Sequence, residues 1–306
     1  MKKKVAVIGG GPAGLECAEY LVKEGFDVTI YEKHNYLGGL LMHGIPEFRL
    51  PKSVVRQKIN KTLEHGIKVE YNQELGVNLF LEELKIEYDV IFLSVGANKP
   101  SKMNVEGEDL EGVFGGNELL EYNLHPDYTD KIVSVIGGGN VAMDCARTIK
   151  RLNAKMVNVI YRRAEEQMPA DEKEIRAAKE EGINFLFQNN IVKIIGESRV
   201  KGLELVKTEM KQSENDSRPV PVNIENSNYE IETDYVVMAI GSMIQEQIMH
   251  LGLDMNKWGN VVVNENYQTS DPQIYAGGDL LGVKNSIAWA VKSGREAAKE
   301  IVKNLS

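Results

Sequence analysis

VAVIGGGPAGLECAEYLVKEGFDVTIYEK, residues 5–33, sets the architecture of this chain, and VSVIGGGNVAMDCARTIKRLNAKMVNVIYRR, residues 133–163, repeats its design. Each copy has an apolar run, a GxGxxG or GxGxxA motif, a helical stretch and a second apolar run. This order is typical of a βαβ unit with a phosphate-binding loop between its first strand and its helix. The sequence therefore predicts two such units.

The small residues of the motif have separate roles. The first glycine allows a tight turn, the second lets the backbone approach a pyrophosphate, and the third small residue keeps the helix close to the sheet. The helix N-terminus offers free N–H groups to the phosphate charge. These positions are Gly9, Gly11 and Gly14 in the first copy and Gly137, Gly139 and Ala142 in the second.

The residue after the second strand predicts which nucleotide each copy binds. Glu32 ends the first copy and is suited to accept hydrogen bonds from a ribose 2′-OH, as in FAD or NAD. Aligning Tyr31 with Tyr161, after a two-residue insertion, places Arg162 opposite Glu32, and Arg163 follows. Two guanidiniums bind a 2′-phosphate that a carboxylate would repel. The simplest pair of ligands is FAD and NADPH; the alternative is two solvated arginines at a strand end.

Composition is consistent with a globular protein of roughly two domains. The 306 residues are 42% hydrophobic and 26% charged, with a net charge of −9. This acidic balance argues against nucleic-acid binding and against a polybasic membrane anchor. The basic residues 2–4 precede an apolar run too short for a signal peptide, and no run approaches the ~18 apolar residues of a membrane span. The sequence predicts a cytoplasmic protein.

The two cysteines indicate packing rather than redox chemistry. Cys17 and Cys145 occupy equivalent positions on the two predicted helices, which favours a small buried side chain in each unit. The sequence has no CxxC motif, and two cysteines cannot ligate an iron–sulfur cluster. We therefore expect electrons to leave the chain directly from a bound cofactor.

The remaining segments predict further elements and one further site. Residues 37–55 are broken by glycines and prolines, and residues 213–221 read as the mobile tip of a hairpin within 199–233. Asp279 follows a glycine pair at a strand end, where it can bond flavin ribityl hydroxyls or cap a helix. We expect a helix over 54–64, strands over 68–71, 88–97 and 235–242, a strand within 269–282, and a helix over 287–305.

Four segments resemble one known group of flavoproteins. They are GGLLMHGIPEFRLPKSVV (residues 38–55), VIGGGNVAMDCARTIKRL (135–152), VIYRRAEEQMPADEKEI (159–175) and IYAGGDLL (274–281). The sequence is similar to the glutamate synthase small-subunit group over residues 4–301. That group includes the flavin and NADPH domains of dihydropyrimidine dehydrogenase and of ferredoxin-linked NADP transhydrogenases.

The resemblance implies an α/β protein with two Rossmann-like dinucleotide-binding domains, in the three-layer flavoprotein fold. An FAD domain would comprise residues 1–127 and 262–306, and an NADPH domain residues 128–261. By motif match, the FAD contacts are Gly9, Gly11, Pro12, Ala13, Gly14, Glu32, Lys33, Gly39, Leu40, Leu75, Gly278, Asp279 and Ala288. The NADPH contacts are Gly137, Gly139, Asn140, Val141, Ala142, Arg162, Arg163 and Glu174.

The resemblance also implies that NADPH reduces FAD by hydride transfer. The cofactors carry this chemistry, so the sequence predicts no catalytic side chain and no metal. The acidic residues of 165–174 are interpreted as a solvated helix face. His43 stands where the group usually has Tyr or Phe, and we interpret it as a packing or solvent residue. The flavin motif begins at Val5, so the usual N-terminal iron–sulfur segment is expected to be lacking.

Three hypotheses about function follow. The chain could pass electrons to a separate iron–sulfur or ferredoxin-like protein, such as a glutamate synthase large subunit. It could instead be a stand-alone NAD(P)H reductase of a quinone or dye. It could also be a non-catalytic NADPH-binding regulatory subunit, although the intact glycines, Glu32 and Asp279 argue against that.

Overall fold

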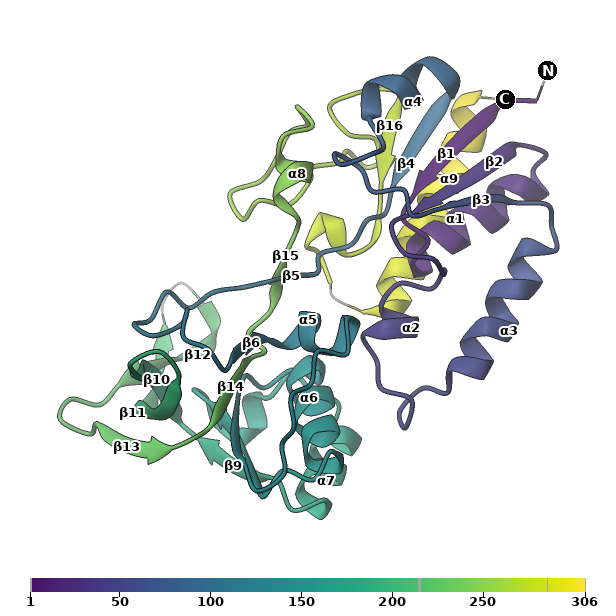
Figure 1. Ribbon diagram of the computed structural model, residues 1–306. Helices are drawn as coiled ribbons and strands as arrows, with labels where there is room; N and C mark the ends of the chain where they lie inside the picture. The colour runs from purple at the N-terminus through teal and green to yellow at the C-terminus, as the bar shows by residue number, and fades with distance from the viewer. Residues whose placement is uncertain (1, 214–215, 285, 306) are drawn as a thin grey trace. The chain divides into compact units, whose positions relative to one another are not determined.

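The computed structural model describes residues 2–213, 216–284 and 286–305 (Figure 1). The chain forms two compact units, unit 1 (Met1–Lys99 and Met243–Ser306) and unit 2 (Pro100–Ser242). Unit 1 is discontinuous in sequence; the sequence-based prediction divides the chain at 127/128 and 261/262, whereas these units divide it at 99/100 and 242/243. The reason is strand pairing and core packing: β6 (Val113–Gly115) pairs with β14 (Tyr235–Met238) in unit 2, whereas Ile244, Ile248 and Val261 enter a core of unit 1.

Unit 1 is built on a five-stranded parallel sheet of strand order β16-β4-β1-β2-β3. The two strands of the first predicted βαβ unit lie side by side, with Ile8 opposite Tyr31. The C-terminal strand β16 pairs with β4 at one edge, so the end of the chain completes the sheet. The bounds are β1 Lys4–Ile8, β2 Asp27–Glu32, β3 Lys68–Tyr71, β4 Val90–Leu93 and β16 Ile274–Ala276.

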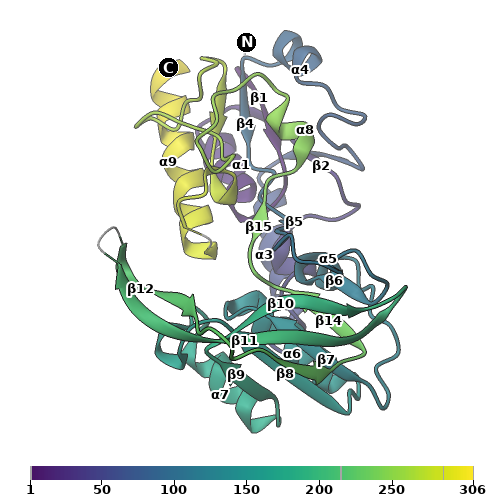
Figure 2. The same cartoon turned by 90° about the vertical axis from the view of Figure 1, so that its left-hand side faces the viewer.

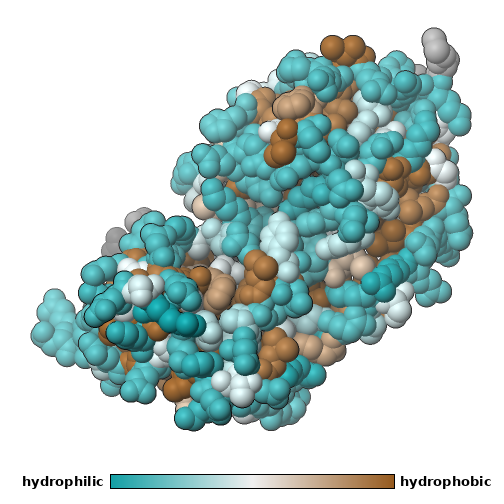
Figure 3. Space-filling view, in the orientation of Figure 1, coloured by the Kyte–Doolittle hydropathy of each residue, from teal (hydrophilic) through white to brown (hydrophobic). Residues whose placement is uncertain are grey.

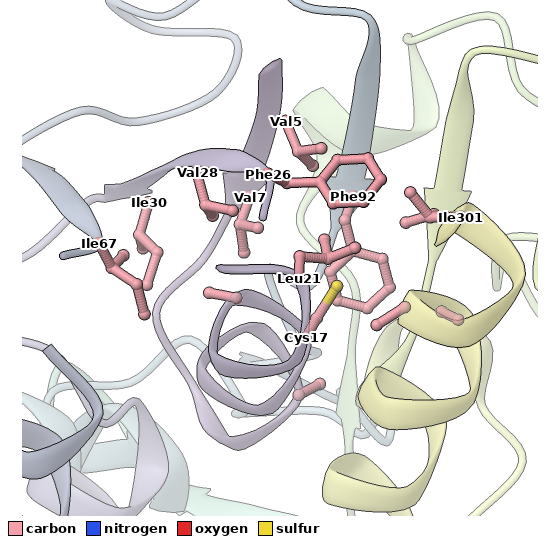
Figure 4. Close-up of a cluster of buried hydrophobic side chains, with 14 of the residues drawn as sticks. Val5, Val7, Cys17, Leu21, Phe26, Val28, Ile30, Ile67, Phe92 and Ile301 are labelled. Atoms are coloured by element: carbon pink, nitrogen blue, oxygen red, sulfur yellow. The ribbon is translucent and has the colours of Figure 1, made fainter. Parts of the chain in front are cut away.

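Both faces of this sheet are covered, which gives unit 1 three layers. On one face α1 (Pro12–Lys23), α3 (Lys52–Leu63) and α9 (Ile287–Leu305) bury the side chains that point their way. Figure 4 shows Cys17 and Leu21 of α1 in one cluster with Phe92 of β4 and Ile301 of α9. The other face carries α4 (Leu81–Glu87), α8 (Glu246–Met249) and the loops around them.

Unit 2 repeats the design with a second five-stranded parallel sheet, of order β6-β14-β7-β8-β9. Alternate residues of its strands point to opposite faces, so Val133 and Val135 enter one core and Ile136 another. The new strands are β7 Ile132–Ile136, β8 Met156–Tyr161 and β9 Asn184–Phe187.

The two faces of the second sheet carry different layers. One face packs against α5 (Gly116–Glu121), α6 (Asn140–Arg151) and α7 (Glu172–Glu180). The other packs against an antiparallel sheet that includes the expected hairpin, as Figure 2 shows. Its strands are β10 Asn189–Gly196, β11 Val200–Ser213, β12 Asp216–Asn223 and β13 Tyr229–Glu232. Residues 214 and 215, at the expected mobile tip, lie outside the described residues.

The short elements show where sequence patterns were less informative. Residues 37–55 are not wholly irregular: they contain one turn of helix, α2 (Leu40–His43), and the start of α3. Strands β5 (Lys99–Pro100) and β15 (Ser242–Met243) form a small ribbon. Among the described residues, no helix has both the length and the apolar character needed to cross a membrane. Hydrophilic residues cover most of the face seen in Figure 3, and the hydrophobic ones form small groups.

Candidate functional site

The first phosphate loop of unit 1 is built as its sequence predicts. Gly9 has a φ of +99°, and a Cβ there would lie 2.5 Å from the carbonyl oxygen of Ser94 on the neighbouring strand end. Gly14 lies so close to Gly9 that any side chain would overlap its carbonyl oxygen. Helix α1 begins at Pro12 directly after Gly11, and no side chain caps it. Its N-terminal N–H groups, with Ala13 in the first turn, are available to an anion.

Glu32 lies beside this loop and is held there by two backbone groups. The side chain is 5% exposed; its Oε2 accepts a hydrogen bond of 2.8 Å from Gly10 N–H, and its Oε1 accepts one of 2.9 Å from His34 N–H. Each carboxylate oxygen has a second lone pair, so the fixed group can still accept a bond from a ligand hydroxyl. Lys33 follows it and is half-buried.

The glycine-rich segment after β2 folds back onto the loop. Gly38 N–H donates to Gly10 C=O at 2.8 Å, and a Cβ on Gly39 would lie 3.0 Å from the Cα of Gly11. Leu40 then begins α2. Lys52 Nζ donates to the carbonyl oxygens of Leu41, at 2.7 Å, and Ile45. The structure therefore brings Gly39 to the phosphate loop, and Leu40 is the next residue along the chain.

The C-terminal segment reaches the same loop from the other end of the chain. Gly278, with a φ of +74°, approaches Ala13 so closely that a Cβ would lie 3.2 Å from the Ala13 Cβ. Its N–H donates to Ser293 Oγ at 2.8 Å. Two segments far apart in sequence thus meet at one place.

Asp279 contributes a carboxyl whose Oδ1 is buried and has no hydrogen-bond partner in the described chain. Burial raises the pKa of this carboxyl to about 6. Asp279 lies in a short 3₁₀ turn (Gly278–Leu281), and no side-chain cap is present there, so the helix-cap alternative is not supported. A buried acceptor without a partner is what a ligand O–H or N–H would satisfy.

Three further residues considered in the sequence analysis, Leu75, Ala288 and His43, have other surroundings in the structure. Leu75 is 4% exposed and packs in the core on the α4 side of the sheet. Ala288 is exposed in the first turn of α9. His43 packs against rings: its centroid lies 4.8 Å from that of His34 and 5.8 Å from that of Tyr36. The packing interpretation of His43 fits this arrangement.

The second phosphate loop has the same backbone plan in unit 2. Gly137 follows β7, and α6 begins at Asn140 directly after Gly139, with no side-chain cap. Ala142 is fully buried and Val141 half-buried in the first turns of the helix. Asn140 Oδ1 accepts a bond of 3.0 Å from Asp171 N–H, which ties the loop to the start of α7.

The strand register corrects the alignment of the two copies. Gly9 N–H bonds to Tyr31 C=O, whereas Gly137 N–H bonds to Ile160 C=O, so the counterpart of Glu32 is Tyr161 and not Arg162. The insertion is one residue shorter than expected. A Cβ on Gly138 would lie 2.6 Å from the Tyr161 ring, which takes the place that the Glu32 carboxylate has beside Gly10.

The two arginines therefore follow the residue that replaces the carboxylate. Arg162 is exposed and Arg163 half-buried, and neither forms an ion pair with the described part of the chain. Their backbone carbonyls are both bonded: Thr208 Oγ1 donates to that of Arg162 at 2.7 Å, and Gln188 N–H to that of Arg163 at 3.1 Å. No carboxylate replaces Glu32 in this copy, and two cations are adjacent.

Glu174 has a different environment from the one predicted. It is 5% exposed and forms a buried ion pair with Arg147 of α6, and Arg147 also bonds Glu181 at 2.8 Å. The acidic stretch is thus not wholly a solvated face, because one of its members joins α6 to α7. This ion pair gives Glu174 a structural role, and we remove it from the candidate nucleotide contacts.

The cysteines are packed as predicted. Cys17 and Cys145 are both fully buried, one in each unit, and burial raises the pKa of each thiol. Such protonated, inaccessible thiols are poor nucleophiles and poor redox groups. Neither unit offers a reactive cysteine.

Three residues of the two sites were missed by sequence reasoning. Ser94 Oγ donates to the carbonyl of Gly9 at 2.9 Å, and Ser293 Oγ accepts from Gly278. Tyr161 was aligned with the wrong partner. No short motif marks the two serines, and Tyr161 is identified as the counterpart of Glu32 only by the hydrogen bonds between the strands.

Comparisons with known proteins agree with this architecture. The family model described as pyridine nucleotide-disulphide oxidoreductase matches residues 3–297. The glutamate synthase [NADPH] small chain of Halomonas elongata is 36% identical over 98% of this chain and 67% of its own length. The beta subunit of an NADP(+)-dependent formate dehydrogenase from Moorella thermoacetica is also 36% identical, over 98% of this chain and 43% of its own length.

A solved structure shows the same fold at lower identity. FprA of Mycobacterium tuberculosis, in complex with NADPH, superposes with a TM-score of 0.88 over 100% of this chain and 85% of its own, at 20% identity. The three-layer, two-unit fold inferred from the sequence is thus confirmed. The chain belongs to the pyridine nucleotide-disulphide oxidoreductase family and, within it, to the oxidoreductases related to the glutamate synthase [NADPH] small chain.

Proposed function

We propose that unit 1 holds FAD and unit 2 holds NADPH, and that electrons then pass to a separate protein. The difference between the ends of the two βαβ units supports this most directly: one offers a buried carboxylate, and the other a tyrosine followed by two arginines. The proposed FAD residues are Gly9, Gly11, Pro12, Ala13, Gly14, Glu32, Lys33, Gly39, Leu40, Gly278 and Asp279, with Leu75 and Ala288 still expectations. Those for NADPH are Gly137, Gly139, Asn140, Val141, Ala142, Arg162 and Arg163.

The residues of unit 1 fit FAD in two independent ways. The loop and the uncapped start of α1 suit a pyrophosphate, with Glu32 beside it for a ribose hydroxyl. The unpaired Oδ1 of Asp279 suits a hydroxyl further along the same ligand. When bound, FAD accepts a hydride from NADPH and can release electrons singly, so the protein's part is to bind and orient.

The acceptor is the second part of the proposal. Neither buried cysteine can relay electrons, and we propose that a separate carrier takes them from the flavin. The names of two relatives describe subunits, a small chain of glutamate synthase and a beta subunit of formate dehydrogenase. We therefore propose an iron–sulfur or ferredoxin-like partner and a cytoplasmic location.

An anaerobic titration tests both parts. Purified protein is reconstituted with FAD, titrated with NADPH while the flavin absorbance is followed, and then mixed separately with an iron–sulfur protein or a quinone. Bleaching by NADPH and recovery with the iron–sulfur protein support the proposal. Recovery with the quinone alone would favour a stand-alone reductase, and no bleaching would favour a binding subunit.

A further inference from the structure

The backbone that carries Arg162 and Arg163 is held by one residue at the end of the neighbouring strand β9 and by one residue from the antiparallel sheet of unit 2. Gln188 lies between β9 and β10, and Thr208 lies within β11. Each bonds one of the two arginine carbonyls, Thr208 through its hydroxyl and Gln188 through its N–H. The pair therefore fixes both residues after β8.

Gln188 and Thr208 also hold each other. Thr208 N–H donates to Gln188 C=O at 2.8 Å, and Gln188 Nε2 donates to Thr208 C=O at 3.2 Å. Gln188 has a φ of +55°, a left-handed conformation that a residue with a side chain adopts only at a cost. Thr208 is 3% exposed and stands where β11 exchanges its partner β10 for β12. This is a specified arrangement and not a loose surface contact.

Fixing this backbone matters because the arginine side chains are long and partly exposed. A guanidinium binds a phosphate best through two parallel N–H···O bonds, which require a defined starting point and direction. Each side chain that becomes ordered on binding also loses conformational entropy. A backbone that is already fixed reduces the total entropy that is lost when the ligand binds. The 2′-phosphate contact should therefore depend on the Gln188–Thr208 pair.

We propose that Gln188 and Thr208 are positioning residues that set the preference of unit 2 for a 2′-phosphate. The inference rests on the proposed NADPH site and extends it to a second sheet, since β11 belongs to the antiparallel layer. Neither residue need touch the nucleotide. Thr208 acts through the Arg162 carbonyl, and Gln188 acts through the Arg163 carbonyl.

The test measures binding of two probes that differ only in the 2′-phosphate, adenosine 2′,5′-bisphosphate and AMP. Isothermal titration calorimetry on the flavin-loaded full chain gives the ratio of their dissociation constants. We expect Thr208→Val, which keeps the shape but removes the hydroxyl, to reduce the preference for the bisphosphate about 3- to 10-fold, the range of one buried hydrogen bond. Binding of AMP should be unchanged, and Thr208→Ser should restore the preference.

Thr233→Val is the matched control. Thr233 is also 3% exposed in unit 2, and its hydroxyl bonds the carbonyls of Tyr235, at 3.0 Å, and Ile132, at 3.2 Å, away from the arginines. It should lower thermal stability while leaving the probe ratio intact. If Thr208→Val does not fold, Thr208→Ala takes its place, because it removes the hydroxyl without adding a methyl group.

The outcomes separate this inference from the function on which it rests. Loss of preference in Arg162→Ala/Arg163→Ala but not in Thr208→Val would overturn the positioning role and leave the NADPH site standing. Equal weakening of both probes by Thr208→Val would also overturn it, because the whole site would then have been disturbed. Equal affinity of the wild type for both probes would refute the 2′-phosphate site itself. Adding Thr208→Val to the double arginine variant should cause no further loss of preference.

Discussion

Two carboxyl groups of unit 1 show how far local surroundings decide what an acidic residue can do. Glu32 accepts hydrogen bonds from two backbone N–H groups and is already held in place. Asp279 is half-buried, its Oδ1 is buried without a partner, and its pKa is raised to about 6. Glu32 is thus held in a fixed position before any ligand binds, whereas Asp279 has an unpaired oxygen that a ligand donor can satisfy.

Asp279 gives a pH-dependent prediction. Its pKa is about 6 in the folded chain, above the ordinary value of 3.8, so its contribution to stability is complete below pH 3.8 and is lost as the pH rises through 6. At pH 7.5 the buried charge therefore destabilises the flavin-free protein. We expect Asp279→Asn to raise the free energy of unfolding by roughly 2–3 kcal/mol at pH 7.5, and by about half of that at pH 5, in urea titrations.

Asp254, an exposed residue of the same unit, supplies the control for this experiment. Asp254→Asn should change stability little at either pH. A gain for Asp279→Asn that is the same at both pH values would contradict the raised pKa. The Asp279→Asn variant should also retain FAD less well, because its amide replaces an acceptor oxygen.

Glu32 gives a prediction about affinity. Glu32→Ala removes the acceptor of two backbone N–H groups and of the proposed ribose contact, each a charge-assisted bond of about 1.5–3 kcal/mol. The dissociation constant of FAD, followed by flavin fluorescence, should rise about 10- to 100-fold. Glu70→Ala, at an exposed position on the neighbouring strand β3, should leave it unchanged. An unaltered affinity of Glu32→Ala would show that FAD does not use this carboxylate.

At the scale of elements, the two βαβ units share a backbone and differ where their second strands end. In the structure Tyr161 occupies the position in unit 2 that Glu32 occupies in unit 1. The second unit therefore has no acidic residue there, and two arginines follow the tyrosine. The same loop can thus hold a pyrophosphate in both units while the ribose ends are treated differently. On the proposed assignment, the strand end and not the glycine motif decides which nucleotide each unit binds.

Replacing both arginines should therefore change choice without abolishing binding. In Arg162→Ala/Arg163→Ala we expect the ratio of kcat/KM for NADPH over NADH to fall about 10- to 100-fold, with the NADH value nearly unchanged. Arg176→Ala, an exposed arginine on α7, is the control for a general loss of positive charge. Equal efficiency of the wild-type protein with the two nucleotides would refute the assignment.

The ion pair between α6 and α7 yields a prediction about stability alone. Arg147→Met leaves Glu174 buried without its cation, which should cost about 3–5 kcal/mol, and adding Glu174→Leu should recover most of the loss. Both tryptophans of the chain, Trp258 and Trp289, lie in unit 1, so their fluorescence does not follow the unfolding of unit 2. Circular dichroism is therefore used, and Arg147→Met should lower the midpoint of the unfolding transition that it follows. The affinity for FAD should be unchanged. Weaker FAD binding would contradict a role confined to unit 2.

Sequence patterns predicted the elements whose periodicity or motif is local. β1, α1, β2 and their counterparts follow from the glycine motif, and α9 follows from its helical stretch. They could not place β6, because its membership of unit 2 depends on pairing with β14 more than a hundred residues later. They also misplaced Tyr161 by one residue, since only the hydrogen bonds between strands fix the register. Ser94 and Ser293 are set by tertiary packing and have no local signature.

For the whole molecule, the proposal makes this chain one half of an electron-transfer pair. NADPH should reduce the bound FAD, and artificial dyes should reoxidise it. Ammonia or glutamine with 2-oxoglutarate should yield no glutamate, by amino-acid analysis, until a glutamate synthase large subunit is added. Glutamate formation by this chain alone would refute the idea, as would rapid reduction of a quinone when every tested iron–sulfur protein fails.

The discontinuity of unit 1 has a consequence for how the protein is made. Unit 2 is contiguous in the chain, so a ribosome has delivered all of its strands before β16 and α9 exist. Unit 1 must wait with the edge of β4 unpaired and the α9 side of α1 uncovered until the last residues emerge. During synthesis unit 2 can therefore fold first. The proposed FAD site of unit 1 is complete only after Gly278 and Asp279 have been synthesised. A nascent chain stalled before β16 would therefore expose an unpaired strand edge and an uncovered apolar face to chaperones.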